Sequence, residues 1–154
     1  GRGDVYKRQV QYIADLYGME MNHFEERREK IFSMLDMQNF SDRRIARLSS
    51  GMKQKTSIAR TIIHDPDVVV FDEPTTGLDV MTARRIIELI RACRDEGKTV
   101  IFSTHQMSEV KLLCDDLAII HEGRLYFSGS RDQFENQMTE STYEDEFVRL
   151  VEEA

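Results

Sequence analysis

Apolar residues in the first third of the chain recur at intervals of three and four, the spacing of one face of an amphipathic helix. This spacing predicts a short helix over residues 10–19 and a second helix over 24–37. A third helical run starts at residues 49–51 and continues until the Asp65-Pro66 pair stops it. The apolar positions that define the second and third helices are Phe24, Ile31, Met34, Leu35, Ala59, Ile62 and Ile63.

The middle of the chain changes to short continuous apolar runs, which are typical of strands. Residues 68–71 read Val-Val-Val-Phe, as expected of a strand buried on both faces of a parallel sheet. Asp79 can cap the helix that follows, and Gly97 would end it. Residues 99–103 form a second predicted strand. The apolar stripe of the helix between the strands comprises Val80, Ala83, Ile86, Ile87 and Ile90.

The last third predicts a short helix over residues 107–114, followed by strands over 117–120 and 125–127 that form a hairpin about Glu122-Gly123. Apolar residues near the C-terminus favour one closing helix. The alternation of strands and helices predicts the α/β class, with helices packed on a mainly parallel sheet.

These patterns divide the chain into four segments. Residues 1–9 show no periodicity, and we interpret them as a leader foreign to the domain. Residues 10–64 are helical, and residues 65–130 carry the alternating strands and helices. Residues 131–154 form an acidic tail with a short helix.

Charge narrows the possible partners. The formal net charge is -7, and the last 24 residues hold eight acidic and two basic side chains. The remainder is nearly neutral and has no basic stripe, which argues against binding to nucleic acid. Two cysteines favour a reducing compartment over a disulfide framework. The longest apolar runs are far shorter than the roughly 20 residues of a membrane span, so any work at a membrane would need a partner.

Two carboxylates, Asp72 and Glu73, come directly after the first strand. A strand that ends in acids delivers them to the carboxyl edge of a sheet, where α/β proteins bind ligands. One acid there can hold Mg²⁺, and the other can orient and deprotonate a water for attack on a γ-phosphate. Acids are also common where a strand meets a polar turn, so the pair alone leaves both interpretations open.

Two further features could meet the same ligand. Residues 48–52, Leu-Ser-Ser-Gly-Met, open a predicted helix, where backbone N–H groups and a hydroxyl can meet phosphate oxygens. Taken by itself, this stretch is better explained by an ordinary N-cap of Ser49 or Ser50. His105 follows the second strand, so we expect its imidazole at the same sheet edge as Asp72 and Glu73. A lone histidine is more often structural or solvated.

The order of residues 48–52, 68–74, 77–79 and His105 resembles the ATP-binding-cassette (ABC) ATPases. In that family these elements are the signature motif, the Walker B strand with its catalytic glutamate, the D-loop and the switch histidine. The resemblance extends from about residue 10 to residue 130. It implies an incomplete P-loop NTPase core with a mainly parallel sheet plus part of the helical subdomain. It is closest in character to bacterial sodium- and drug-exporting cassettes.

The resemblance also implies a role for each matching residue. Asp72 would assist Mg²⁺, Glu73 would be the general base, and His105 would sense the γ-phosphate. Asp79 would communicate across a dimer. The signature would contact the ATP held by the opposite subunit, mainly through Ser49 and Gly51; its residues are Leu48, Ser49, Ser50, Gly51 and Met52. Ser50 and Met52 stand where the family usually has glycine and glutamine.

The sequence contains no phosphate-gripping loop of the form G-x-x-x-x-G-K-[ST]. The nearest match, residues 92–99, begins with alanine. It also ends a predicted helix and enters a strand, which is the wrong order for a helix N-terminus to face phosphate. We therefore expect the phosphate loop upstream of the family match, and we expect this chain alone to bind MgATP poorly and not to hydrolyse it.

The function implied by the resemblance is an ATP-hydrolysing subunit that couples dimer closure to export. Its partners would be a transmembrane permease subunit and a second ATPase subunit, and its place the cytoplasmic face of the membrane. An alternative is an ABC-type ATPase acting on nucleic acid or ribosomes, which would carry basic patches or coiled-coil arms. Another is a non-catalytic remnant that serves as an interaction module. The acids Asp72 and Glu73, together with His105, favour descent from an active enzyme.

Overall fold

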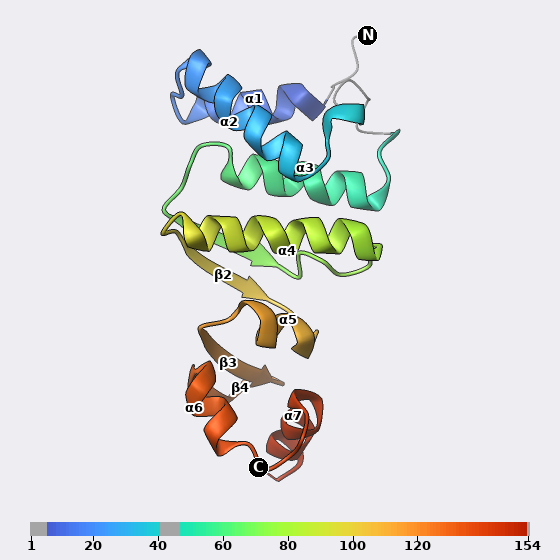
Figure 1. Cartoon of the computed structure of the whole chain (residues 1–154), viewed down its shortest axis with the longest axis vertical. Coiled ribbons are helices and arrows are strands. Elements are labelled where there is room, and N and C mark those ends of the chain that lie inside the picture. The colour runs from blue at the N-terminus through green and yellow to red at the C-terminus, as the bar shows by residue number, and fades with distance from the viewer. Residues whose placement is uncertain (1–5, 41–46, 154) are drawn as a thin grey trace. The chain divides into compact units, whose positions relative to one another are not determined.

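The computed structural model describes residues 6–40 and 47–153, and the chain divides into two compact units, Gly1–Ser103 and Thr104–Ala154 (Figure 1). Each unit is described by itself. The described elements of the first unit are α1 (Tyr6–Leu16), α2 (Met21–Met34), the short 3-10 helix η1 (Gln38–Phe40), α3 (Ser50–Ile62), β1 (Val68–Asp72), α4 (Val80–Asp95) and β2 (Thr99–Ser103).

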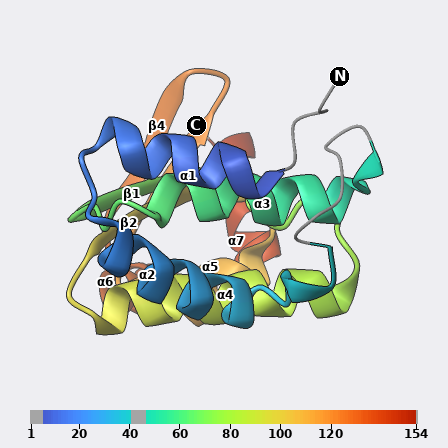
Figure 2. The same ribbon diagram turned by 90° about the horizontal axis from the view of Figure 1, so that it is seen from above.

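Helix α1 begins at Tyr6, within the segment that lacks sequence periodicity. It ends at a Schellman motif, in which the N–H of Gly18 bonds to the carbonyl of Asp15 and that of Met19 to the carbonyl of Ala14. Gly18 has a φ of 69°, which glycine adopts without steric cost. Helix α1 lies along α3 (Figure 2), so its buried face belongs to the helical part of the first unit.

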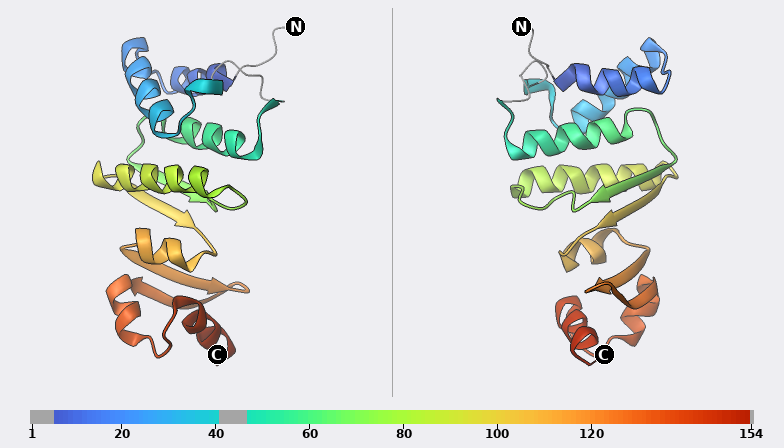
Figure 3. Two further views of the ribbon diagram at one scale, coloured as in Figure 1. Left: turned by 45° about the vertical axis from the view of Figure 1, so that its right-hand side comes forward. Right: turned by 180° about the vertical axis from the view of Figure 1, so that it is seen from behind.

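The sheet of the first unit consists of β1 and β2, which run parallel (Figure 3). Their register places Val70 opposite Ile101 and Asp72 opposite Ser103. Helix α3 contacts β1 and α4 contacts β2. The predicted strand–helix–strand order is confirmed, and both strands end at the same edge.

One sequence expectation about β1 is wrong. The strand is buried on one face only, where Val69 and Phe71 are 1% and 5% exposed. On the other face Val68, Val70 and Ile101 are 54%, 63% and 55% exposed. Successive side chains of a strand point to opposite faces. Helix α3 contacts β1 and α4 contacts β2, and the β1 side chains that are buried, Val69 and Phe71, lie on one face. The continuous Val-Val-Val run therefore indicates that a strand forms, but it does not indicate that both faces of the strand are buried.

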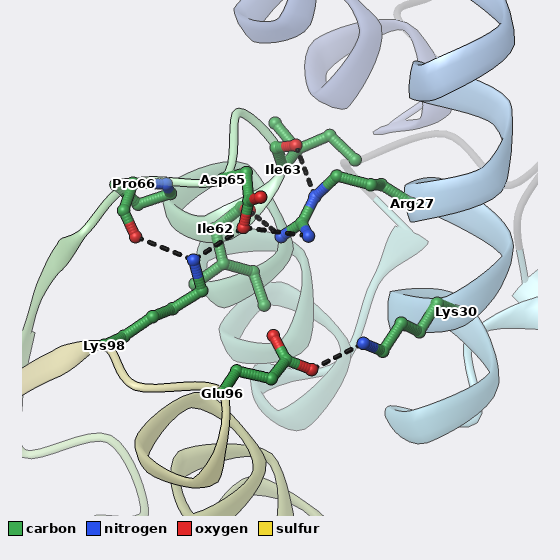
Figure 4. A network of polar contacts seen from close by, with 8 residues as sticks. All are labelled: Arg27, Lys30, Ile62, Ile63, Asp65, Pro66, Glu96 and Lys98. Atoms are coloured by element: carbon green, nitrogen blue, oxygen red, sulfur yellow. Dashed lines mark hydrogen bonds and ion pairs between the residues drawn. The ribbon is translucent and has the colours of Figure 1, made fainter.

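Arg27 of α2 makes polar contacts with the C-terminal end of α3 and with Asp65, which follows that helix (Figure 4). Its Nε donates to the carbonyl of Ile63 at 3.1 Å and its Nη2 to the carbonyl of Ile62 at 2.9 Å. Its Nη1 lies 2.9 Å from Asp65 Oδ1. Helix C-termini leave carbonyls without intrahelical partners, and the guanidinium supplies donors for two of them.

The same network reaches the turn between α4 and β2 (Figure 4). Lys98 Nζ lies 2.6 Å from Asp65 Oδ1 and donates to the carbonyl of Pro66 at 3.0 Å. Lys30 Nζ lies 2.5 Å from Glu96 Oε1. The network thus joins α2 to the segments that lead into both strands, and it fixes where β1 and β2 begin.

The second unit is built on an antiparallel hairpin (Figure 3). Glu122 and Gly123 form its two-residue turn with φ values of 47° and 77°, as a type I′ turn requires. The hairpin predicted about these two residues is therefore confirmed. The elements of this unit are α5 (Met107–Leu113), β3 (Asp116–His121), β4 (Arg124–Ser130), α6 (Arg131–Gln137) and α7 (Tyr143–Glu152). Its buried cluster comprises Val110, Ile119, Phe134 and Tyr143.

The acidic tail contains two helices, α6 and α7, where one was expected. Helix α6 starts with a capping box, in which Ser130 Oγ accepts the N–H of Gln133 at 3.1 Å and Gln133 Oε1 accepts the N–H of Ser130 at 2.9 Å. The S-x-x-Q spacing is a recognised start signal that our sequence reasoning missed. Over the described residues, we find no helix with the length and apolar character that crossing a membrane demands.

Candidate functional site

Asp72 and Glu73 lie at the carboxyl end of β1, as expected. Ser103, the last residue of the neighbouring strand β2, contacts both: its Oγ donates to Asp72 Oδ1 at 2.5 Å and accepts the N–H of Glu73 at 3.0 Å. The N–H of Glu73 also approaches the carbonyl oxygen of Ser103 at 3.2 Å. Sequence reasoning missed Ser103. The signal that could have found it is the parallel register, which pairs the last residue of each strand.

Glu73 adopts a backbone conformation that few residues with a side chain occupy, with a φ of 42°. Thr76 Oγ1 donates to Glu73 Oε2 at 2.8 Å, and the N–H of Thr76 reaches the carbonyl of Glu73 at 3.3 Å. Strained backbone of this kind persists only where the surroundings hold it, and it concentrates at functional sites. The half-buried Glu73 side chain is therefore held in one orientation at the sheet edge.

The predicted signature residues form the start of α3. Ser49 is the N-cap, and its Oγ accepts the N–H of Met52 at 3.3 Å. Leu48 is 7% exposed and anchors the turn, whereas Ser49 and Ser50 are exposed. The alternative interpretation of an ordinary N-cap is thus realised. A capping hydroxyl still has a proton to donate, so capping and phosphate contact are compatible at this helix N-terminus.

Asp79 caps α4, as predicted. Its Oδ1 accepts the N–H of Thr82 at 3.0 Å and its Oδ2 accepts the Thr82 hydroxyl at 2.8 Å. The hydrogen bond from the Thr82 N–H lowers the pKa of the Asp79 carboxyl below its ordinary value. Asp79 is therefore a fixed anion at the end of the loop that begins at Glu73.

His105 belongs to the second unit and is exposed. It follows β2 by two residues in the chain. Thr104 shapes this turn, because its Oγ1 accepts the N–H of Gln106 at 3.0 Å and donates to the buried Glu109 Oε2 at 2.7 Å. The expected meeting of His105 with Asp72 and Glu73 stays a prediction.

The residues at this edge fit a Mg²⁺ ion that takes its further ligands from water and phosphate. Within residues 6–40 and 47–153, no cluster of three His, Cys, Asp or Glu side chains could hold a metal ion. Mg²⁺ commonly takes one or two carboxylates and fills its remaining positions with water and substrate phosphates. The Asp72 carboxylate beside the Ser103 hydroxyl fits that donor set.

Residues 92–99, the nearest sequence match to a phosphate loop, form the end of α4 and the turn into β2, as expected. Gly97 has a φ of 84°, its N–H bonds to the carbonyl of Arg94 at 2.8 Å, and the N–H of Lys98 bonds to the carbonyl of Cys93 at 3.1 Å. This is a Schellman motif. Lys98 is engaged with Asp65 on the way into β2.

Comparison with known proteins supports the family resemblance. The family model described as "ABC transporter" matches residues 4–76. The ABC transporter ATP-binding protein NatA of Bacillus subtilis is 40% identical over 135 residues, which cover 87% of this chain and 55% of that protein. The Nod factor export ATP-binding protein I of Burkholderia lata is 37% identical over 114 residues, covering 74% of this chain and 38% of that protein.

A solved structure gives the same result for the fold. The structure titled "Structure of ATP binding subunit of ABC transporter" aligns with a TM-score of 0.87 at 24% identity, and the match covers 98% of this chain and 64% of that one. The fold is therefore that of an ABC ATP-binding subunit. The chain spans about half the length of the curated relatives that it matches. With its sequence matches, its fold and its ordered motifs in agreement, this chain belongs to the family of ABC transporter ATP-binding proteins.

Proposed function

We propose that this chain is the part of an ATP-hydrolysing transporter subunit that carries the signature, the Walker B acids and the D-loop. The observation that carries the proposal is the Glu73 turn. A half-buried carboxylate is fixed beside the strand-end Asp72 by Thr76 and Ser103, in a backbone conformation with a φ of 42°. A general base needs such a fixed orientation toward the water that it deprotonates.

In this proposal Glu73, Asp72 and His105 each have a distinct task. Glu73 orients the attacking water and accepts its proton. Asp72, held by the hydrogen bond from Ser103, would offer a carboxylate oxygen to a Mg²⁺ ion or to its water shell. Bound Mg²⁺ would supply charge neutralisation for the phosphates. His105 would donate a hydrogen bond to the γ-phosphate, which fixes the phosphoryl group against the water.

The signature and the D-loop act on a second nucleotide. The exposed Ser49 hydroxyl and the N–H groups at the start of α3, around Gly51, would contact ATP held by an opposite subunit. Asp79, fixed by Thr82, would report on that contact across the dimer. Dimer closure would drive a transmembrane permease from the cytoplasmic face of the membrane. The name of the Burkholderia relative, a Nod factor export protein, supports export as the direction of transport.

ATP turnover also needs a phosphate loop, which these 154 residues do not contain. The experiment that tests the proposal supplies one. In the Bacillus subtilis relative NatA, the 135 matched residues are replaced by the corresponding residues of this chain. We expect the hybrid protein to hydrolyse ATP in the presence of Mg²⁺, and the isolated 154-residue chain to show no turnover.

The hybrid protein with Glu73→Gln provides the decisive comparison. Glutamine keeps the shape of the side chain but cannot accept the proton, so kcat should fall by about 10²–10⁴-fold while ATP still binds. Asp132→Asn, in the exposed part of the acidic tail, is the matched control and should retain full activity. Equal ATP turnover by the hybrid protein with and without the Glu73 substitution would refute Glu73 as the base.

A further inference from the structure

A hydrogen bond joins the signature helix to the residue that follows the candidate base. Gln54 Nε2, one helical turn after Ser50 on α3, donates to the carbonyl oxygen of Pro74 at 3.2 Å. Pro74 is fully buried and Gln54 is half-buried. Gln54 lies on α3 and Pro74 in the turn that follows β1, so this bond is a tertiary contact and not part of either local structure.

The same two segments also come close together at the other end of the loop, where Gly51 faces Leu78 and Thr82. A Cβ atom added at Gly51 would lie 3.6 Å from Thr82 Cγ2 and 3.9 Å from Leu78 Cδ2, which is ordinary van der Waals contact. The first turn of α3 therefore lies directly on the D-loop and the start of α4. The hydrogen bond from Gln54 and this close approach at Gly51 place the loop over residues 74–79 against the signature helix.

The loop between these contacts is the one that orients Glu73. Its internal backbone hydrogen bonds run from the N–H of Thr76 to the carbonyl of Glu73 at 3.3 Å and from the N–H of Leu78 to the carbonyl of Thr75 at 3.2 Å, and the Thr76 hydroxyl adds the bond to the Glu73 carboxylate described above. Both backbone bonds lie at the long end of the ordinary range, so contacts from outside the turn help to keep the unfavourable φ of Glu73. Gln54 provides such support at the residue next to Glu73.

We propose that Gln54 is a positioning residue: it couples the start of α3 to the orientation of the Glu73 carboxylate. An α-helix transmits a displacement along its axis as a rigid element. A phosphate that draws in the N-terminus of α3 would therefore also pull on the Pro74 carbonyl, one turn further along. Glu73 would then be held for catalysis in the same subunit whose signature is engaged. This coupling rests on the proposed roles of Glu73 and of the signature, whereas the hydrogen bond itself does not.

The test uses the 154-residue chain and needs no nucleotide. Gln54→Met keeps the side-chain length and removes the donor, and Gln54→Lys restores a donor for the Pro74 carbonyl. Amide hydrogen exchange by NMR is measured at Thr76 and Leu78, with Ile86 in the middle of α4 as the reference for global opening. We expect exchange at Thr76 and Leu78 to be about fivefold faster in the Met variant and close to wild type in the Lys variant. Exchange at Ile86 should be unchanged.

Two controls make the result specific. Thr61→Ala removes an exposed hydroxyl from the same helix and should alter none of these rates. The ¹³C signal of the Glu73 carboxyl should move in the Met variant and return in the Lys variant, which a general loss of stability would not produce. Unchanged exchange and an unchanged Glu73 signal in the Met variant, or failure of the Lys variant to restore them, would overturn the positioning role.

A kinetic arm separates this inference from the proposed function. In the NatA hybrid described above, Gln54→Met should lower kcat about fivefold and leave the KM for ATP near the parent value. An unchanged kcat would overturn the catalytic consequence. A parent hybrid that does not hydrolyse ATP would count against the proposed function, and the exchange measurement would still decide whether Gln54 positions Glu73.

Discussion

The backbone of Glu73 differs from the other left-handed positions of this chain. Asp36 and Asp65 follow helix ends and Glu122 lies in a hairpin turn, where such values are part of the local geometry. Glu73 instead follows a strand directly, at a cost on the order of 1–3 kcal/mol. Ser103 and Thr76 hold it there through hydrogen bonds. A single residue thus carries strain where the proposed chemistry needs a fixed carboxylate.

His64 provides a prediction at the scale of one side chain. It stacks on Tyr17 with ring centroids 3.8 Å apart, and its buried Nδ1 has no hydrogen-bond partner among residues 6–40 and 47–153. Burial lowers the pKa of His64 below its ordinary 6.5, and the nearby Arg27 and Lys98 lower it further, against the opposing effect of Asp65. The unfolded state therefore binds a proton at higher pH than the folded state does.

The free energy of unfolding should accordingly fall as the pH drops below about 6.5. His64→Phe keeps the aromatic stack and removes the titrating group, so its stability should change less between pH 7.5 and 5.5. Urea denaturation followed by circular dichroism at several pH values measures both slopes. Identical slopes for the two proteins would show that His64 does not titrate on unfolding.

At the scale of elements, α3 is held at both ends by side chains from elsewhere in the chain. Its start lies on the D-loop, and its end is bound by Arg27 of α2 through two carbonyls and Asp65. Helix propensity contributes little to an isolated helix of 13 residues, so these tertiary contacts determine where α3 lies. They also align the signature turn with the strand edge.

Replacing Arg27 tests this attachment. Arg27→Met keeps much of the apolar stem and removes all three polar contacts, which should lower the free energy of unfolding by about 2–3 kcal/mol. Arg27→Lys keeps the charge but not the planar fork, so it should recover only part of that loss. Urea denaturation gives both values. Full recovery by lysine would show that charge alone, and not the bidentate geometry, secures the end of α3.

The two tail helices depend on one buried carboxylate. Glu146 is 1% exposed, and its Oε2 accepts the N–H groups of Thr139 and Glu140 at 3.0 and 3.1 Å. Arg149 Nη2 donates to its Oε1 at 2.5 Å. The hydrogen bond from Arg149, together with those of the two N–H groups, lowers the pKa of Glu146 to about 2. One acidic side chain of the tail, that of Glu146, therefore stabilises the fold from a buried position.

This depressed pKa predicts the acid sensitivity of the second unit. The Glu146 carboxylate stabilises the fold fully above its unfolded pKa of 4.5, and that contribution is lost as the pH falls toward about 2. Glu146→Gln should cost about 2–3 kcal/mol at pH 7, and the difference from wild type should shrink at pH 3. Stability curves at the two pH values decide. A constant difference would show that the cost arises from packing and not from charge.

At the scale of the whole molecule, the uncovered face of the sheet is the feature that stands out. Val68, Val70 and Ile101 are each more than half exposed on adjacent strands. Contiguous exposed apolar surface of this kind favours association. The chain matches about half the length of its curated relatives, and its fold agrees with a longer solved subunit.

Substitution on this face should therefore change solution behaviour without unfolding the protein. Val70→Thr keeps the β-branched shape and should cost no more than about 0.5 kcal/mol, while it reduces concentration-dependent association in sedimentation velocity. Val69→Thr, one residue earlier but buried, should instead destabilise by about 1–3 kcal/mol. Equal destabilisation by the two changes would mean that Val70 is covered in solution.

Local patterns in the sequence sufficed for the elements and for the identity of the site. The Val-Val-Val-Phe-Asp-Glu run identified β1 and its acids, Asp79 and Gly97 marked the ends of α4, and Glu122-Gly123 marked the hairpin. The order of the motifs was enough to indicate the ABC ATPases. These features depend on neighbours in the chain, whose preferences act over a few residues.

The contacts that orient the site could not be obtained in this way. Ser103 meets Asp72 across 31 positions of the chain and Gln54 meets Pro74 across 20. Neither pair has a local signal, because each exists only once the strands are in register and α3 lies on the loop. The uncovered face of β1 has the same origin. An apolar run shows that a strand forms, whereas which of its faces is buried depends on the elements that fold against it.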